Sequence, residues 1–432
     1  NTASTIKDLS RFHTLDFYAF FINPYSVART LLLTIWDIVL EKWRFRQDRR
    51  NGLQPILGKD KRGGVYPLMR AFTTVIMREL NIETLMGDMF AGVPSAYATF
   101  VGYDEVAHHS GVESEDAFDI LFKMDQQFGR LESAAQQAPR PYHLVVLADH
   151  GQSEGATFKQ RYHITLEELV QNLLKEYRVE GAADVHEDWK YVNVFLTEAM
   201  QSQQKAVSQP LGRALKNRTV DGQAALGPEA EVAVSEAKKA EGEEADDEDR
   251  VVVLASGNLG LVYGTQLDER VTLEEMEDYF PGLLDGLAQH EGVGFIMIRS
   301  QEHGPVVIGA RGRNYLAEDR VEGENPLAGF GPNAAEHLRR TDSFPDAPDI
   351  LVNSFYNEET NDVAAFEELI GSHGGLGGYQ TQPFLLYPAE LEVEEGQLVG
   401  AAAVYRQFKL WLNQLHAGDD GRPPADNVEA TA

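Results

Sequence analysis

The sequence predicts an α/β fold in which a mainly parallel central sheet is flanked by helices. Two observations support this prediction. Strand-like and helix-like segments alternate along 96–177, and this order favours parallel strands with helices on both faces. The segment 142–151, "YHLVVLADHG", is continuously apolar from Leu144 to Ala148, as expected for a strand buried on both faces. We therefore expect polar side chains that follow these strands to gather at one edge of the sheet.

The composition is that of a soluble globular protein. The chain has 432 residues, of which 43% are hydrophobic and 25% charged. Its formal net charge of −30 argues against stable nucleic-acid binding, which needs a basic surface. Cysteine is absent, so disulfides and thiolate chemistry are excluded. A small anionic substrate would have to be held by local positive charge, such as metal ions.

Residues 17–40 come closest to a membrane segment. The dipeptide Asn23-Pro24 interrupts the apolar run, and Arg29 and Asp37 would be costly inside a bilayer. Apolar residues then recur at helical spacing and predict an amphipathic helix: Leu32, Ile35, Trp36, Val39, Leu40 and Trp43. We expect this face to pack on the protein's own core. Docking on an anionic membrane surface, which the following run "KWRFRQDRR" would suit, is the alternative.

The remaining elements follow from the same patterns. "AYATFVGYD" (96–104) is predicted as a strand, and 114–137 as a helix with Ser114 as its N-cap. A second helix is predicted at 165–177. Further strands are predicted at 250–264 (two strands around a turn), 292–300, 304–312 and 349–356.

The predicted organisation has one α/β catalytic domain interrupted by an acidic linker. The segment 229–249 holds ten acidic residues against two lysines and cannot bury enough apolar surface to order itself. The predicted parts are a helical, membrane-proximal segment (1–60), an α/β metal-binding core (61–200), an acidic low-complexity, disordered linker (201–250), the continuation of the α/β domain (251–415) and a disordered tail (416–432).

Potential metal ligands cluster in three motifs. In "YDEVAHHSG" (103–111), Asp104 and His108 are four residues apart, so a helical turn would bring their side chains together. Asp149 and His150 follow the second predicted strand, and His373 lies among five glycines in "GSHGGLGG". Each motif alone is weak. Together they offer only nitrogen and oxygen ligands, the set expected for Zn²⁺ or Mn²⁺.

The ordered motifs "GYDEVAHH", "VVLADHGQS" and "GSHGG" resemble the type I phosphodiesterase/nucleotide pyrophosphatase branch of the alkaline phosphatase superfamily. The resemblance is greatest to bacterial, membrane-associated members, and it implies an alkaline phosphatase-like fold. It also implies two divalent metal ions, Zn²⁺ with Mn²⁺ as an alternative. One ion would be held by Asp104, His108 and His373, and the second by Asp149 and His150.

The resemblance further implies hydrolysis of a phosphodiester or pyrophosphate bond in a small, phosphorylated, nucleotide-like substrate. Paired cations stabilise the attacking and leaving oxygens of such a displacement. His109 is interpreted either as a residue that supports the metal ligands or contacts substrate, or as a packed histidine. Tyr103, Gln152 and Tyr162 are further candidates near the motifs.

The family supplies its Ser or Thr nucleophile, and one further Asp ligand, from a segment upstream of the D-x-x-x-H motif. No strand or Asp precedes Thr2, Ser4 or Thr5, so none of them is assigned as nucleophile. We expect the intact protein to be an enzyme associated with a membrane, and this chain alone to be inactive. The alternative is a catalytically incomplete metal- or ligand-binding module of the same fold. A sulfatase-like relative would need a Cys or Ser in the same upstream segment.

Overall fold

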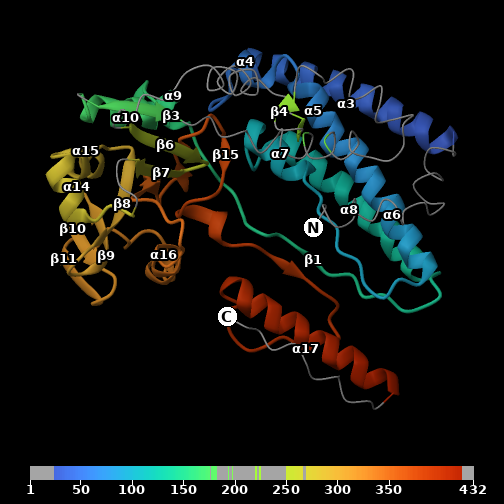
Figure 1. The fold of residues 1–432 in the computed structure, drawn as a ribbon. Helices are drawn as coiled ribbons and strands as arrows, with labels where there is room; N and C mark the ends of the chain where they lie inside the picture. The colour runs from blue at the N-terminus through green and yellow to red at the C-terminus, as the bar shows by residue number, and fades with distance from the viewer. Residues whose placement is uncertain are drawn as a thin grey trace.

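The computed structural model describes residues 24–175, 177–181, 250–265 and 269–420, with a few positions between 193 and 224. The described chain has a helical region, formed by the first seven helices, and a sheet region, formed by an eight-stranded sheet and its covering helices (Figure 1). The last helix, α17 (Gly400–Asp420), lies apart from both. Of the predicted metal ligands, Asp104 and His108 lie on α7 of the helical region, and His373 lies on a loop that contacts the sheet region.

The helical region begins with the 28-residue helix α3 (Pro24–Asn51). The helices that follow are α4 (Lys59–Arg62), α5 (Tyr66–Ala71), the π-helix η2 (Phe72–Met77), α6 (Arg78–Ala91), α7 (Gly102–Ser110) and α8 (Glu115–Ala135). The predicted helix at 114–137 is confirmed as α8. Its N-cap is also confirmed, because the Ser114 side chain accepts a hydrogen bond from the Ala117 N–H.

The orientation of α3 differs from the prediction. Its apolar residues point to solvent: Leu32 is 68% exposed and Trp36 60%, and Ile35, Val39 and Trp43 are also exposed. The buried face instead carries Thr30, Thr34, Asp37, Glu41 and Phe45. The expectation that the apolar face packs on the protein's own core is therefore wrong. Helical spacing separates the two faces of a helix, but the neighbouring residues decide which face is buried.

Two buried arginines, Arg62 and Arg70, contact the buried face of α3. Arg62 donates from Nε to Glu41 Oε1 (3.0 Å) and from Nη2 to Glu41 Oε2 (3.2 Å). Arg70 donates to Glu41 Oε2 and, from Nη2, to Asp116 Oδ1 (3.1 Å), and its Nε lies 3.4 Å from Asp37 Oδ2. All five side chains are buried. We call these residues the buried ion cluster: Asp37, Glu41, Arg62, Arg70 and Asp116.

Charges in the buried ion cluster stabilise one another. Burial opposes ionisation of Asp116, but the guanidinium groups of Arg70, Arg44 and Arg62 outweigh it, and the pKa of Asp116 is lowered. Burial likewise opposes protonation of Arg70, and the surrounding carboxylates outweigh it, so the pKa of Arg70 is raised. A buried ion that loses its partner is strongly destabilising. The cluster therefore ties α3, α4, α5 and α8 together.

The eight-stranded sheet has the order β11-β10-β9-β8-β12-β7-β6-β3. Its strands are β3 (Arg178–Gly181), β6 (Arg250–Ser256), β7 (Leu259–Gly264), β8 (Val293–Ser300), β9 (Gly304–Gly309), β10 (Gly312–Tyr315), β11 (Arg320–Gly323) and β12 (Ile350–Ser354). The strands predicted in 250–356 are thus confirmed. Every neighbouring pair in this sheet is antiparallel except β3 with β6.

The prediction of a mainly parallel sheet is therefore wrong for the described residues. β6 and β7 are joined by the two-residue turn Gly257-Asn258, and β8 and β9 by a three-residue turn. Such short connections can only join antiparallel neighbours, whereas parallel strands need a long crossover. The β-α-β order at 96–177, from which parallel strands were predicted, does not build this sheet.

Both faces of the sheet are covered. On one face, buried residues such as Ile296, Ile298 and Val352 pack with α10 (Leu166–Leu173), α14 (Leu273–Tyr279) and α15 (Leu283–Gln289). On the other face, Phe295, Met297 and Leu351 pack with α16 (Ala334–Asp342). Alternate residues of β8 and β12 therefore point to opposite cores, as the pleat of a strand requires. Figure 1 shows α10, α14 and α15 on one side of the strands and α16 on the other.

The strand predicted at 142–151 shrinks to β1 (Val146–Leu147), which pairs antiparallel with β16 (Leu385–Leu386). Residues 144–148 are only half-buried, so burial on both faces is wrong for this segment. A small sheet, in the order β13-β14-β2-β15, lies beyond it. Its strands are β2 (Ser153–Glu154), β13 (Tyr356–Asn357), β14 (Asp362–Val363) and β15 (Gly371–Ser372). This sheet brings residues after 150 next to the glycine-rich loop.

Other predicted parts lie partly outside the described residues. Within 201–250 the structure describes the antiparallel pair β4 (Thr219–Val220) and β5 (Gln223–Ala224) and the first residue of β6. The rest of the predicted linker, residues 1–23 with Thr2, Ser4 and Thr5, and residues 421–432 are not described. α17 continues to Asp420, beyond position 416, where the tail was predicted to begin. No helix of the described part has the length and apolar character needed to cross a bilayer.

Candidate metal centre

Three predicted ligands from distant parts of the chain converge beside α7. Asp104 lies in the first turn of α7, His150 follows β1, and His373 follows β15. One potential ligand atom of each lies within 4.8 Å of the corresponding atoms of the other two. We call these residues the three-residue cluster.

α7 brings His108 to the same place. His108 is buried one turn after Asp104, with Nε2 3.3 Å from Asp104 Oδ2, so the predicted convergence of this pair on a helix is confirmed. The prediction that Asp104 ends a strand is wrong, since 95–101 forms no strand and the helix starts at Gly102. The ring centroids of His108 and His373 are 5.2 Å apart.

The structure does not separate the ligands into the two implied sets. The rings of His150 and His373 stack at 3.6 Å, and His373 Nε2 lies 3.9 Å from Asp104 Oδ1. His150, implied for the second metal, therefore lies against ligands implied for the first. Asp149 is outside the three-residue cluster: its side chain is 80% exposed, with Oδ1 3.6 Å from His150 Nε2. The division between two metal ions remains a prediction.

Backbone carbonyl oxygens contact Nδ1 of two histidines. His108 Nδ1 lies 2.8 Å from the Gly371 carbonyl oxygen, and His150 Nδ1 lies 3.0 Å from the Gly151 carbonyl oxygen. Because a carbonyl oxygen only accepts, a proton on each Nδ1 can be donated to it, and Nε2 is then the ring atom that would bind a metal. Metal-binding histidines are commonly oriented by such a contact. The donor set of carboxylate oxygens and imidazole nitrogens fits a divalent cation such as Zn²⁺ or Mn²⁺.

The carboxylate of Asp104 is held in its charged form. Burial opposes its ionisation, but the charge and hydrogen bond of His108 and the charges of His373 and His150 outweigh burial. The pKa of Asp104 is therefore well below its ordinary range. Gln152 donates from Nε2 to Asp104 Oδ1 and is itself buried. Gln152, a candidate from the sequence, thus contacts the carboxylate directly.

Two buried asparagines that sequence reasoning missed hold the glycine-rich loop. Asn258 accepts from the Gly375 N–H (3.0 Å), and Asn353 accepts from the Leu376 N–H (2.7 Å). Both donate from Nδ2 to the Leu376 carbonyl oxygen. The signal for Asn353 was an amide side chain directly after the apolar run 350–352 of a predicted strand. We call this pair the asparagine clasp, and it fixes the loop that carries His373.

Two glycines allow close backbone contacts around the centre. Gly257 has φ +57°, and a Cβ there would overlap the His373 carbonyl oxygen. At Gly151 a Cβ would overlap the Tyr379 carbonyl oxygen. The glycine after Asp149-His150 is therefore required by close approach to another segment.

The other histidine and tyrosine candidates lie away from the three-residue cluster. His109 is buried, stacks on Tyr66 at 3.9 Å, and places Nδ1 3.1 Å from the Glu105 carbonyl oxygen. This environment is that of a packed histidine. Tyr103 donates to the Val112 carbonyl oxygen (3.2 Å), and Tyr162 packs against the core of the sheet region.

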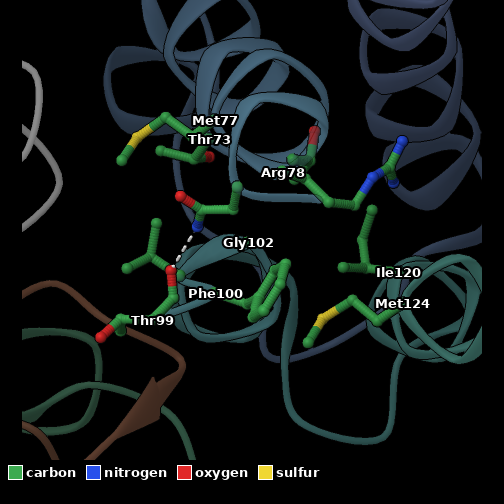
Figure 2. A pocket seen from close by; sticks show the side chains of 11 residues that line it. Thr73, Met77, Arg78, Thr99, Phe100, Gly102, Ile120 and Met124 are labelled. Carbon is green, nitrogen blue, oxygen red and sulfur yellow. Dashed lines mark hydrogen bonds between the residues drawn. The ribbon is translucent and has the colours of Figure 1, made fainter. Parts of the chain in front are cut away.

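A small pocket lies where η2, α6, α7 and α8 meet, and none of the five predicted ligands lines it (Figure 2). Residues 99–102, which lead into α7, form one wall. Asn81 holds this wall by donating to the Thr99 carbonyl oxygen at 2.7 Å. The contact helps to fix the start of α7 and therefore the position of Asp104.

Residues 83–268 match the family model of type I phosphodiesterase / nucleotide pyrophosphatase, which belongs to the alkaline phosphatase superfamily. The resemblance to this family is thereby confirmed over a span that contains the first two motifs, "GYDEVAHH" and "VVLADHGQS". The matched span is less than half of the chain; it includes Asp104, His108, Asp149 and His150 and ends before His373. No curated protein and no solved structure matches the chain.

Proposed function

We propose that this protein is a metal-dependent hydrolase of phosphodiester or pyrophosphate bonds that uses two divalent metal ions. The observation that carries the proposal is the convergence of Asp104, His150 and His373 in a chain with a phosphodiesterase family match. Zn²⁺ is the proposed ion, with Mn²⁺ as the alternative, because the ligands are imidazole nitrogens and carboxylate oxygens.

In this proposal Asp104, His108 and His373 hold one ion, and Asp149 and His150 hold the second. The contacts of His108 Nδ1 and His150 Nδ1 with backbone carbonyl oxygens, which turn each Nε2 toward a carboxylate of the proposed site, support their roles as ligands. When bound, the two cations stabilise the attacking and leaving oxygens and lower the pKa of the nucleophile.

The chain's own residues prepare this site. Gln152 orients the ionised carboxylate of Asp104, and the asparagine clasp fixes the loop of His373. The proposed substrate is a small phosphodiester or nucleotide-like molecule. Stable binding of a nucleic-acid polymer is disfavoured by the net charge of −30. Association of the intact protein with a membrane is part of the proposal.

The test combines metal content, measured by elemental analysis of the purified chain, with hydrolysis of bis-p-nitrophenyl phosphate. Asp104→Ala and His373→Ala should each weaken binding of one ion by roughly tenfold or more. His337→Ala, on α16 and outside the centre, is the matched control and should change neither quantity. Unchanged metal content in both ligand variants would overturn the assignment.

The same measurement separates two ions from one. If Asp149 and His150 hold a second ion, replacing either with Ala removes that ion, whereas Asp104→Ala removes the first ion. The double variant D104A/D149A then loses both ions. If all five proposed ligands share one ion, every variant loses the same ion. Hydrolysis should appear at least in a form extended upstream to supply the nucleophile. Bound metal without hydrolysis in either form would favour the alternative, a metal- or ligand-binding module.

A further inference from the structure

The exposed side of α3 forms a continuous apolar stripe. Its members are Tyr25, Leu32, Ile35, Trp36, Val39 and Trp43, and all of them are more than half exposed. At about 100° per residue these positions fall on one side of the helix, opposite the buried residues Asp37 and Glu41. We call this stripe the outer face of α3. Figure 1 shows α3 at the edge of the molecule, with α5, α6 and α8 all on one side of it.

The buried ion cluster keeps this stripe in solvent. Turning the outer face inward would expose Asp37 and Glu41 and separate Glu41 from both buried arginines. Separating a buried ion pair is strongly unfavourable. The exposure of the apolar stripe is therefore enforced by contacts on the opposite side of the same helix.

The outer face continues into a basic end. Arg46 and Arg50 follow Trp43 on the same side of α3, with Lys42 and Arg49 beside them, and all four cations are exposed. This local charge is opposite in sign to that of the whole chain, which is −30. An apolar face with tryptophans and adjacent basic residues is the pattern of a helix that lies in a membrane interface.

We propose that the outer face of α3 docks on the surface of an anionic lipid bilayer, with the helix axis parallel to the membrane. The opposite side of α3 is packed on protein, so only the outer face can enter the headgroup region. Because the rest of the chain is acidic, an anionic surface attracts the basic end of α3 and repels other faces, which gives the bound protein one orientation. This proposal deepens the membrane association named under the proposed function and does not depend on the hydrolase activity.

The experiment measures binding of the chain to vesicles of phosphatidylcholine alone and of phosphatidylcholine with added phosphatidylglycerol, by flotation. We expect binding to the anionic vesicles that weakens with salt. Trp36→Ser with Trp43→Ser should lower it by at least about tenfold, because both exposed indoles leave the interface. Arg49→Gln with Arg50→Gln should lower it roughly tenfold, on anionic vesicles only.

The matched control is Tyr279→Ser with Phe344→Ser, which removes two exposed aromatic side chains from the sheet region and should leave binding unchanged. Circular dichroism checks that each variant is folded. Three results would overturn the proposal: no binding to anionic vesicles, binding that survives the tryptophan substitutions, or self-association without lipid that those substitutions abolish. The last result would assign the outer face to a second copy of the chain. A metal chelator should leave vesicle binding unchanged, so failure of the hydrolase proposal is read separately.

Discussion

The helical region and the sheet region are held together by different interactions. Beneath α3, three carboxylates and two arginines share a buried space, and the apolar side chains of the same helix point to solvent. In the sheet region, Ile296 and Phe295 are buried in apolar cores on opposite faces of β8. Hydrophobic patterning alone therefore describes the sheet region well and gives the wrong orientation for α3.

The largest expected effect comes from removing one cation of the buried ion cluster. Arg70→Met should lower the free energy of unfolding by about 3–5 kcal/mol, because it leaves Glu41, Asp37 and Asp116 short of a buried partner. Urea denaturation followed by far-UV circular dichroism measures the change.

The matched control is Arg311→Met, which removes an exposed arginine paired with the exposed Glu324 at 2.6 Å. An exposed pair contributes only about 0–1 kcal/mol, so this variant should unfold almost as the parent does. Equal stability of the two variants would mean that the ions do not hold the helical region together, and the contrast between the regions would disappear.

The two regions also differ in how they hold the candidate metal centre. The helical region presents Asp104 on a helix, whereas the sheet region presents His373 on a loop that touches Gly257. Gly257→Ala should weaken metal binding because the new Cβ displaces the His373 backbone. Loss of a contact that orients a metal ligand weakens binding by roughly tenfold. Titration with Zn²⁺ followed by calorimetry measures the affinity.

Gly282→Ala is the control for this substitution. Gly282 also has a positive φ, +88°, but no atom lies within 4 Å of the position of its Cβ. Backbone strain is thus common to both variants, and displacement of His373 is not. An equal loss of zinc affinity in both would attribute the effect to general destabilisation.

The smallest expected effect tests the apolar core. Ile296→Val removes one methylene from a fully buried side chain and should cost about 0.5–1.5 kcal/mol. Hydrogen exchange of the β8 amides, compared with those of α3, localises the change to the sheet region. Added salt should leave this loss unchanged while it alters the stability of exposed ion pairs. A loss of stability as large as that of Arg70→Met would contradict the contrast between the regions, because removing one methylene would then cost as much as removing a buried cation.

Local patterns in the sequence predicted the elements that depend on local chemistry. Ser114 caps α8 because its hydroxyl reaches the backbone three residues on, and Asp104 meets His108 because they are one helical turn apart. The strands between 250 and 356 followed from their β-forming residues, and the three metal-ligand motifs led to a family that residues 83–268 match.

Features that depend on distant partners were missed. The polar side of α3 is buried because Arg62 and Arg70, which come later in the chain, supply its counter-ions. Asn258 and Asn353 gain their role only when the loop at 374–377 lies over them. The strand direction was predicted wrongly because strands that alternate with helices along the chain were assumed to be neighbours in one sheet. Of residues 142–151, Val146 and Leu147 instead pair with β16, far along the chain.

The contact between the His108 ring and the Gly371 carbonyl oxygen joins residues 263 positions apart. Contacts of such long range form late, because the entropy of closing the intervening loop must be offset first. During synthesis the centre cannot be completed until residue 373 has emerged, after both the helical and the sheet regions have been made. A metal ion held by Asp104 and His373 would then fasten the early part of the chain to its late part, so that metal capture would act as the closing step of folding.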